Sequence, residues 1–216
     1  MSLEEFDGFS DIFVTHGHFD HIVNLPEIVR RNPAVVIHCT QTPYHTLRKK
    51  GVPEKNLALL SFGQTLEVQG FCIRTYHGKH AELPKVSPSL VKRIFCSPAL
   101  GNLPYALREN RLCPENEETV FYQIAAEGRT IALMGSLNLW EEVVYPTGMD
   151  LLILPYNGWT DNYPPAMRVI ERLQPQRVVL DHYDDTFPPL TAPLDLTPIL
   201  QHENVQALTL RQSITV

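Results

Sequence analysis

The sequence predicts a single α/β domain over residues 1–216. First, segments that read as buried strands alternate with segments of helical periodicity along most of the chain. Second, one pair of β-rich runs flanks a short turn, which predicts an antiparallel hairpin and therefore sheets that are not purely parallel. Third, 44% of the 216 residues are hydrophobic and 19% are charged, which is enough apolar material for a full core.

Strands are expected where short apolar or alternating runs end at turn residues. The segment 64–77 predicts two paired strands around Gly70, and 119–135 predicts the hairpin, with its turn at 127–129. The other predicted strands are 11–15, 34–39, 57–60, 150–156, 177–183 and 205–210.

Helices are expected where apolar residues recur at helical spacing. The segment 22–31 fits this pattern because Pro26 lies near its start, and 42–51 ends at a glycine. The other predicted helices are 137–144, 164–174 and 194–202. Proline gathers at 82–89 and 186–193, and these segments are expected to be loops that do not divide the domain.

Composition excludes several classes of protein. The net charge of -6 disfavours a nucleic-acid surface held by bulk electrostatics. Apolar stretches are too short to cross a bilayer, and the acidic start is unlike a signal peptide, so a cytoplasmic protein without a membrane partner is expected. The widely spaced Cys39, Cys72, Cys96 and Cys113 suggest buried reduced thiols and neither a zinc ribbon nor a disulfide framework.

The segment "VTHGHFDH" at 14–21 places three histidines and one aspartate directly after an apolar strand. In an extended or tightly turned segment, residues i and i+2 face the same way, so His16 and His18 can present two imidazole nitrogens to one cation. Asp20 and His21 follow where the chain turns into a helix, and they can serve a second cation. Imidazole with carboxylate is a ligand set for zinc, and also for iron or manganese.

The stretch "THGHFDH" resembles the signature of the metallo-β-lactamase superfamily, and the order of elements from residue 11 onward resembles that family's plan. The resemblance implies a four-layer αββα sandwich with a metal site at the edge between two sheets. It also implies a third histidine after a later strand and a last one beyond a late strand, which correspond here to "RTYHGKHAE" and "RVVLDHYDD".

The first of these stretches offers both His77 and His80. Residues three apart on an extended chain do not share a face, so only one is expected to be a direct ligand. We favour His80, where the strand gives way to a loop; the reverse assignment stays open. The second stretch supplies His182, with Asp181 beside it as a candidate to orient a ligand.

The sequence departs from the family pattern at Ser136. There the family carries an aspartate that bridges two metals, and a neutral hydroxyl is a poor ligand for a divalent cation. We therefore expect either one firmly bound metal on His16, His18 and His80, or a two-metal site completed by another carboxylate. Asp184 and Asp185 are the nearby candidates for that role.

A second departure concerns the start of the chain. Family members build two or more strands before the histidine motif, and only about a dozen residues precede it here, so the N-terminal strands are expected to be largely missing. Either the chain is truncated, or the open sheet edge is covered by another copy, which suggests a homodimer.

The resemblance implies hydrolysis by a metal-activated water, most simply with one or two Zn²⁺ ions and with Mn²⁺ or Fe²⁺ as alternatives. Asp20 is the candidate to hold or deprotonate that water, and His182 is a candidate general acid or oxyanion donor. The expected substrate is a small ester, lactone or phosphoester. Candidate pocket residues near the strand ends are Tyr76, Tyr156, Asn157, Trp159 and Tyr183.

Two other readings are weighed against this one. The serine at 136 and the short N-terminus suggest a degenerate, non-catalytic member of the fold that binds or assembles. Redox chemistry with iron at the same ligands is a third reading, and the loss of the bridging carboxylate argues against it.

Overall fold

The computed structural model describes residues 3–82, 87–157, 162–183, 191, 193–208 and 212–216. Two sheets face each other in the described residues. The small sheet is parallel, in the order β1-β2-β3, and consists of Asp11–Phe13, Val36–Cys39 and Leu57–Leu59.

The large sheet has the order β10-β9-β8-β7-β6-β5-β4. Strands β7 to β10 are mutually parallel, whereas β4 to β7 alternate in direction, so the predicted hairpin is confirmed as β6 and β7. The strands are Thr65–Val68 (β4), Phe71–His77 (β5), Val120–Ala126 (β6), Arg129–Met134 (β7), Leu151–Pro155 (β8), Arg177–Asp181 (β9) and Val205–Ala207 (β10).

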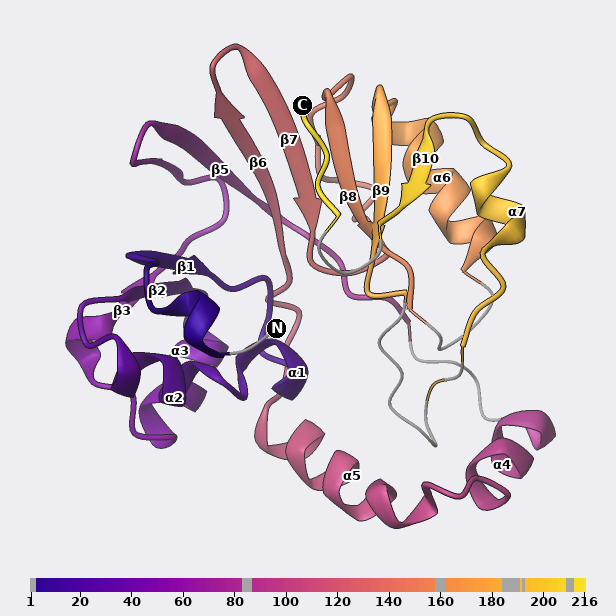
Figure 1. The fold of residues 1–216 in the computed structure, drawn as a ribbon, viewed down its shortest axis with the longest axis horizontal. Helices are drawn as coiled ribbons and strands as arrows, with labels where there is room; N and C mark the ends of the chain where they lie inside the picture. Colours follow the sequence, from indigo (N-terminus) through magenta and orange to yellow (C-terminus); the bar gives the residue numbers. More distant parts are fainter. Residues whose placement is uncertain (1–2, 83–86, 158–161, 184–190, 192, 209–211) are drawn as a thin grey trace.

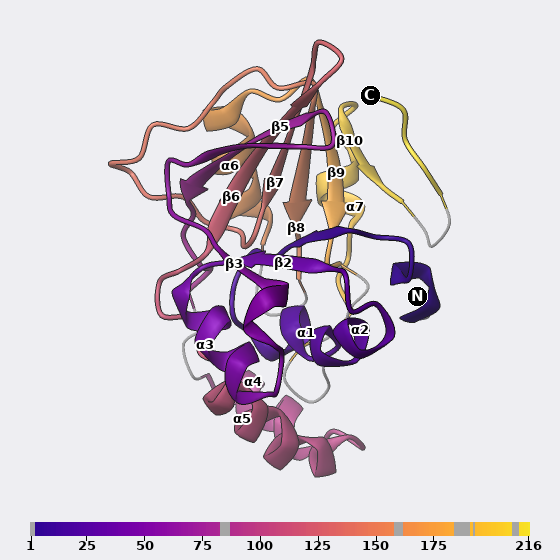
Figure 2. The same ribbon diagram turned by 90° about the vertical axis from the view of Figure 1, so that its left-hand side faces the viewer.

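Helices cover the outer faces of both sheets and complete four layers (Figure 1 and Figure 2). The small sheet is covered by α1 (Phe19–Ile22), α2 (Leu25–Arg31) and α3 (Gln41–Lys49), and the large sheet by α6 (Tyr163–Leu173) and α7 (Thr197–Leu200). Short 3-10 turns lie at Leu3–Phe6, Glu54–Asn56 and Leu100–Asn102. The predicted αββα sandwich is therefore present.

Three apolar clusters hold the layers together, one at each interface. Ile22, Ile37 and Leu47 belong to the cluster between the small sheet and its helices. Leu152 and Leu173 belong to the cluster between the large sheet and its helices. The third cluster, between the sheets, contains Leu60, Ile73, Val120 and Tyr122.

The hydroxyl of Tyr122 links the two sheets through a hydrogen bond. It is buried and donates to the carbonyl of Val14 at 2.6 Å, directly before the histidine motif. The backbone N–H of Val120 donates to the carbonyl of Thr15 at 2.8 Å. These bonds fix the end of β1 against the middle of the large sheet, because buried polar groups of this kind need their partners.

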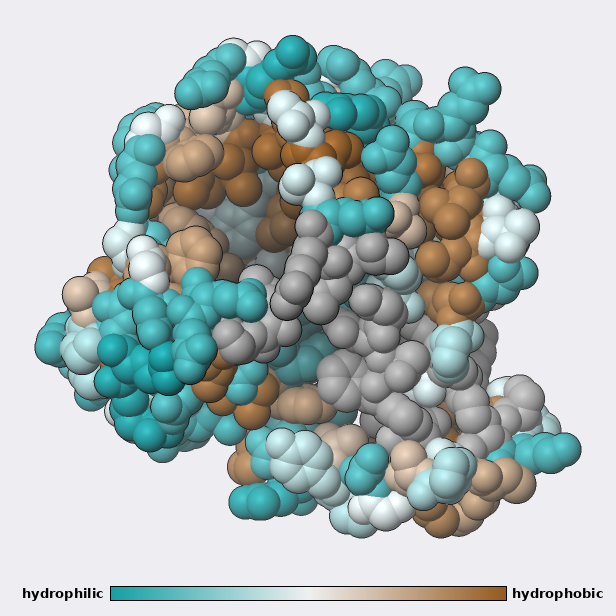
Figure 3. Space-filling view, viewed as in Figure 1, coloured by the Kyte–Doolittle hydropathy of each residue, from teal (hydrophilic) through white to brown (hydrophobic). Residues whose placement is uncertain are grey.

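The small sheet leaves part of the large sheet uncovered. Figure 3 shows a hollow with hydrophobic walls between the two sheets. Phe13, Ile124 and Leu133, which pack against the cluster between the sheets, are only partly buried. Among the described strands, β1 pairs with β2 alone, which leaves its other edge open.

Two helices were not predicted. They are α4 (Pro88–Phe95) and α5 (Leu103–Leu112), which form an arm that projects below α1 (Figure 1). Each has a proline in its first turn, where the missing N–H costs no hydrogen bond, and Ser87 caps α4 by accepting from the N–H of Leu90. The proline of α4 lies in the segment 82–89 that was expected to be a loop, and no element was predicted over α5.

The helix predicted at 137–144 is wrong, because the segment is an irregular loop. Its carbonyls are bonded from outside: the Arg172 guanidinium donates to the carbonyls of Trp140 and Val143, each at 2.9 Å. Tertiary partners therefore satisfy the backbone groups that a helix would pair internally.

Smaller differences concern boundaries and thiols. The helix expected at 22–31 is two helices that meet at Asn24, and α7 is shorter than expected. All four cysteines are free as expected, but only Cys39 and Cys113 are buried, and Cys96 is exposed. In the part of the chain that the structure describes, no helix has the length and apolar character needed to span a bilayer.

Candidate metal centre

The topology brings four strand ends to one edge of the sandwich. Strands β5, β7 and β9 run in the same direction, so their carboxyl ends meet at one edge of the large sheet. The end of β1 is joined to this edge through Thr15 and Val120. The segments that follow β1, β5 and β9 carry the histidines predicted as ligands, and the segment after β7 carries Ser136.

The first cluster consists of His16, His18 and His80. One ligating atom from each lies within 4.8 Å of the other two. His16 Nε2 lies 3.1 Å from His18 Nδ1, and the ring of His80 lies 5.1 Å from that of His16 and 4.6 Å from that of His18. Three imidazoles at such distances match the ligand set of a catalytic zinc ion that keeps a fourth position for water.

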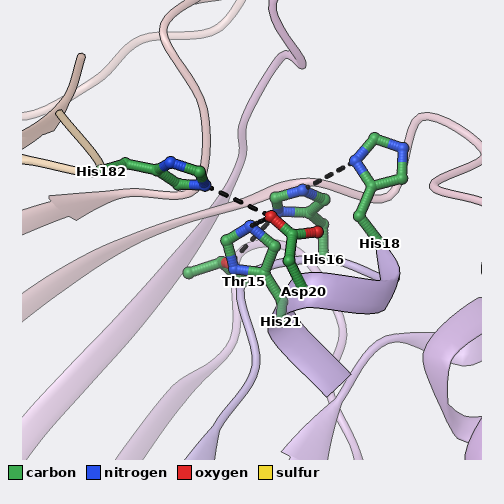
Figure 4. Close-up of polar contacts among 6 residues, drawn as sticks. All are labelled: Thr15, His16, His18, Asp20, His21 and His182. Carbon is green, nitrogen blue, oxygen red and sulfur yellow. Dashed lines mark hydrogen bonds and ion pairs between the residues drawn. The ribbon is translucent and has the colours of Figure 1, made fainter. Parts of the chain in front are cut away.

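The second cluster consists of Asp20, His21 and His182, whose ligating atoms also lie within 4.8 Å of one another. His182 Nε2 lies 3.3 Å and His21 Nε2 3.5 Å from the same oxygen of Asp20 (Figure 4). The rings of His16 and His21 are 4.1 Å apart, so the two clusters adjoin. The structure thus gathers all six residues predicted as metal ligands.

Thr15 was not predicted as a site residue. Its hydroxyl lies 3.2 Å from His16 Nδ1 and 3.4 Å from His21 Nδ1, so one side chain touches a histidine of each cluster (Figure 4). Hydrogen bonds of this kind orient metal-binding histidines. Its only sequence signal is its place before His16.

The surroundings of His77 and His80 differ: His80 is grouped with His16 and His18, whereas His77 belongs to neither cluster found among the described residues. His77 Nε2 lies 2.7 Å from the carbonyl of Glu117, and its ring stacks on Phe62. A carbonyl only accepts, so this nitrogen carries a proton and has no lone pair for a metal. His80 uses Nδ1 in the same way, 2.8 Å from the carbonyl of Ala81, which leaves its Nε2 lone pair available.

Replacing His80 with alanine is expected to weaken metal binding about a hundredfold. The variant lacks one of the few ligands, and we assign about 3 kcal/mol of the binding free energy to that ligand. His77→Ala is the matched control and should keep the affinity within about threefold while costing about 1 kcal/mol of stability. Competition with a chromophoric zinc chelator measures both constants. A larger loss in His77→Ala would reverse the assignment.

His182 follows β9 with φ 60, in the left-handed region that residues other than glycine seldom occupy. This conformation turns its side chain toward Asp20, 162 positions away in sequence. Backbone strain of about 1–3 kcal/mol is typical of functional sites, where the surrounding structure holds it.

Burial and the neighbouring imidazoles favour the neutral forms of His16 and His18. Burial, followed by the neighbouring His21 and His18, holds the pKa of His16 well below its ordinary value. Burial, followed by His80, lowers the pKa of His18 to about 4. For Asp20, burial raises the pKa, but the hydrogen bond from His182 and the charge of His21 outweigh it, so the pKa is lowered overall. A metal ion binds imidazoles in their neutral form and carboxylates in their ionised form. The pKa shifts of His16, His18 and Asp20 favour these forms.

The metal-free protein is expected to lose stability as the pH falls from 6.5 towards 4. In that interval the unfolded chain binds a proton at His18 and the folded chain does not, because the folded pKa is about 4. The contribution of neutral His18 to the free energy of unfolding is fully present above pH 6.5. By pH 4 about 3 kcal/mol of that free energy is lost. Denaturant unfolding across this range measures it, and His18→Gln should flatten the profile. An unchanged slope in that variant would contradict the assignment.

The remaining predicted residues fall into three groups. Tyr156 belongs to the core cluster of the large sheet, and Tyr76 packs against it. Asn157 accepts a hydrogen bond from Asn162, the Tyr183 hydroxyl donates to the carbonyl of Leu208, and Asp181 is exposed. Trp159, Asp184 and Asp185 lie outside the described residues.

Comparison with known proteins identifies the family. Residues 2–183 match the model of the beta-lactamase superfamily domain. The chain is 26% identical over 183 residues to a UPF0173 metal-dependent hydrolase of Roseiflexus sp. (strain RS-1), a match that covers 84% of this chain and 66% of the relative. It is 28% identical over 181 residues to one of Koribacter versatilis (strain Ellin345), covering 83% and 68%.

Solved structures share the fold at low identity. Igni18, a metallo hydrolase from Ignicoccus hospitalis KIN4/I, superposes with a TM-score of 0.58 at 19% identity, over 96% of this chain and 81% of that one. Zn²⁺-bound PqqB from Methylobacterium extorquens gives 0.60 at 15% identity, over 92% and 70%. On the family match and this fold, the chain belongs to the metallo-β-lactamase superfamily.

Proposed function

We propose that the protein is a metal-dependent hydrolase of a small ester, lactone or phosphoester. The observation that supports this most directly is the grouping of the three imidazoles of His16, His18 and His80, whose ligating atoms lie within 4.8 Å of one another. The relatives from Roseiflexus and Koribacter are described as metal-dependent hydrolases, which agrees with the proposal. Zn²⁺ is the expected metal because it favours such ligands; the carboxylate of the second cluster also suits Mn²⁺ or Fe²⁺.

A bound metal supplies a water of lowered pKa and polarises the oxygen of the bond to be cleaved. Asp20 lies beside the first cluster with an ionised carboxylate, and we assign to it the orientation of the attacking water and the acceptance of its proton. His182 donates to Asp20 and holds that carboxylate in place. The same N–H could instead donate to the oxygen that becomes negative during attack, in which case it would leave Asp20.

A small substrate agrees with the space beside the site. A cavity of about 550 Å³ adjoins the loop that carries His80, and its walls include Lys79, Ala81, Leu137 and Trp140. Cavities of this size are typical of small-molecule sites. The acidic balance of the chain does not favour a long nucleic acid.

A second candidate is a binding module without turnover. Ser136 favours it, because the side chain that replaces the family's bridging carboxylate is engaged with a backbone N–H. A module of this kind would keep the first metal but would lack the paired charges that activate a substrate.

The test combines metal analysis with a substrate panel. Protein freed of metal by chelation is titrated with Zn²⁺, Mn²⁺ or Fe²⁺, and metal per chain is measured by mass spectrometry. Turnover is then followed on p-nitrophenyl acetate, γ-butyrolactone and bis-p-nitrophenyl phosphate. One tightly bound ion with metal-dependent turnover of one class supports the hydrolase. Bound metal without turnover supports the binding module, and no retained metal contradicts both.

We also propose a homodimer, on the open edge of β1 and the adjacent hollow. An uncovered strand edge pairs readily with another strand. Light scattering is expected to give twice the chain mass, and a mass equal to one chain would exclude the dimer.

A further inference from the structure

Ser136 lies two residues after β7, on the side of the site that carries His80. Its side chain is buried, and its Oγ accepts a hydrogen bond from the N–H of Ala81 at 2.9 Å. We propose that Ser136 is a positioning residue of the metal centre, which fixes the orientation and tautomer of His80 through Ala81. The inference builds on the proposed function, because it assigns a role toward the same metal.

Ala81 connects the serine to the histidine. Its N–H donates to Ser136, and its carbonyl accepts from His80 Nδ1 at 2.8 Å. Since the carbonyl cannot donate, Nδ1 holds the proton and Nε2 keeps its lone pair toward His16 and His18. Ser136 thus anchors the residue whose carbonyl selects the metal-binding tautomer.

The position of Ser136 relative to His16 is itself fixed. Its neighbour Gly135 is so closely packed that an added Cβ would lie 2.9 Å from Thr15 Cβ, Thr119 Cγ2 and the carbonyl oxygen of Val120. Thr15 in turn lies against His16 and His21. The hydrogen bond from the N–H of Val120 to the carbonyl of Thr15 and the pairing of β6 with β7 hold the end of β7 beside the histidine motif. The Ser136–Ala81 bond then fixes the backbone next to His80 against the same end of β7.

This role explains why a hydroxyl suits the position. A serine oxygen accepts one N–H at ordinary distance without adding charge, whereas a carboxylate there would need cationic partners to offset its burial. With Ser136 directed at the backbone, the three imidazoles of the first cluster are left as the principal ligands. We therefore expect one firm metal site rather than two equivalent ones.

The test uses three variants. Ser136→Ala removes the acceptor, Ser136→Thr keeps a hydroxyl, and Thr75→Val removes a different buried hydroxyl on β5, which donates to the carbonyl of Ser61 at 2.7 Å. Zn²⁺ affinity is measured by chelator competition. Ser136→Ala is expected to weaken binding 10- to 100-fold, roughly the range for partners that orient ligands. Ser136→Thr should restore most of it, and Thr75→Val should leave it unchanged.

A second readout needs no metal. Long-range ¹H–¹⁵N spectra of the metal-free protein report which ring nitrogen of His80 is protonated. The wild type is expected to show the Nδ1–H form and Ser136→Ala a mixture of both forms. If Ser136→Ala folds with unchanged affinity and an unchanged His80 spectrum, the inference is overturned. If the wild type binds no metal, the proposed function fails, and the spectra still decide the role of Ser136.

Discussion

His16→Ala is expected to reduce metal-dependent hydrolysis by about a thousandfold or more and to remove the tightly bound metal. His16 is buried, and its ring lies 4.9 Å from that of His18, 4.1 Å from that of His21 and 5.1 Å from that of His80. Its loss therefore removes one ligand and leaves a cavity at the junction of both clusters. A thousandfold loss corresponds to about 4 kcal/mol, within what metal activation of water supplies.

His45→Ala is the matched control, because His45 is exposed on α3 and touches Gln41 rather than the clusters. Metal per chain and kcat/KM are measured for both variants on whichever substrate the wild type hydrolyses. Retention of the metal by His16→Ala, with kcat/KM within tenfold of the wild type, would show that the reaction does not depend on this cluster.

Gly17→Ala is expected to lower the free energy of unfolding by about 3 kcal/mol and to weaken metal binding as well. A Cβ at this position would lie 2.4 Å from the carbonyl oxygen of Pro114 and 3.6 Å from Pro43 Cδ. The nearer atom belongs to the backbone, so the loop between His16 and His18 has to shift. Forced packing of this kind is costly, and here it also separates two ligands.

Gly101→Ala is the control for the glycine change. Nothing lies within 4 Å of a Cβ built on Gly101, and its φ is not in the left-handed region. Its unfolding free energy should stay within about 0.5 kcal/mol of the wild type. Denaturant unfolding measures both variants. Equal stabilities for Gly17→Ala and Gly101→Ala would mean that the loop near Pro114 yields without cost.

The structure confirms the predicted elements whose local sequence pattern matches the way they pack in the fold. Strands such as β8 and β9 are buried apolar runs, and the 127–129 turn joins two β-rich segments, so periodicity and turn residues were sufficient. The segment 137–144 has helical spacing but is a loop, because Arg172, which is distant in sequence, satisfies three of its carbonyls. Helix α4 was missed because its first-turn proline lies in the proline-rich segment 82–89, which was expected to be a loop. No element was predicted over α5.

Part of the candidate site could likewise be predicted from the sequence, and part could not. Its histidine motif is local, so its likeness to a metal-binding pattern was visible before any fold was known. The choice between His77 and His80 was open in sequence, and the structure favours His80 because its ring is grouped with those of His16 and His18. Thr15 was missed because a lone threonine before the motif has no distinguishing signal.

The sequence by itself determined the fold class, the superfamily and the set of candidate ligands, since these depend on periodicity and on residue types a few positions apart. Only the tertiary structure decided that His80 joins His16 and His18, that the Ser136 hydroxyl accepts from the N–H of Ala81, and that Asp20 meets His182 across 162 positions. The physical reason is that such contacts depend on how separate strands end at a common edge, and local patterns carry no record of that geometry.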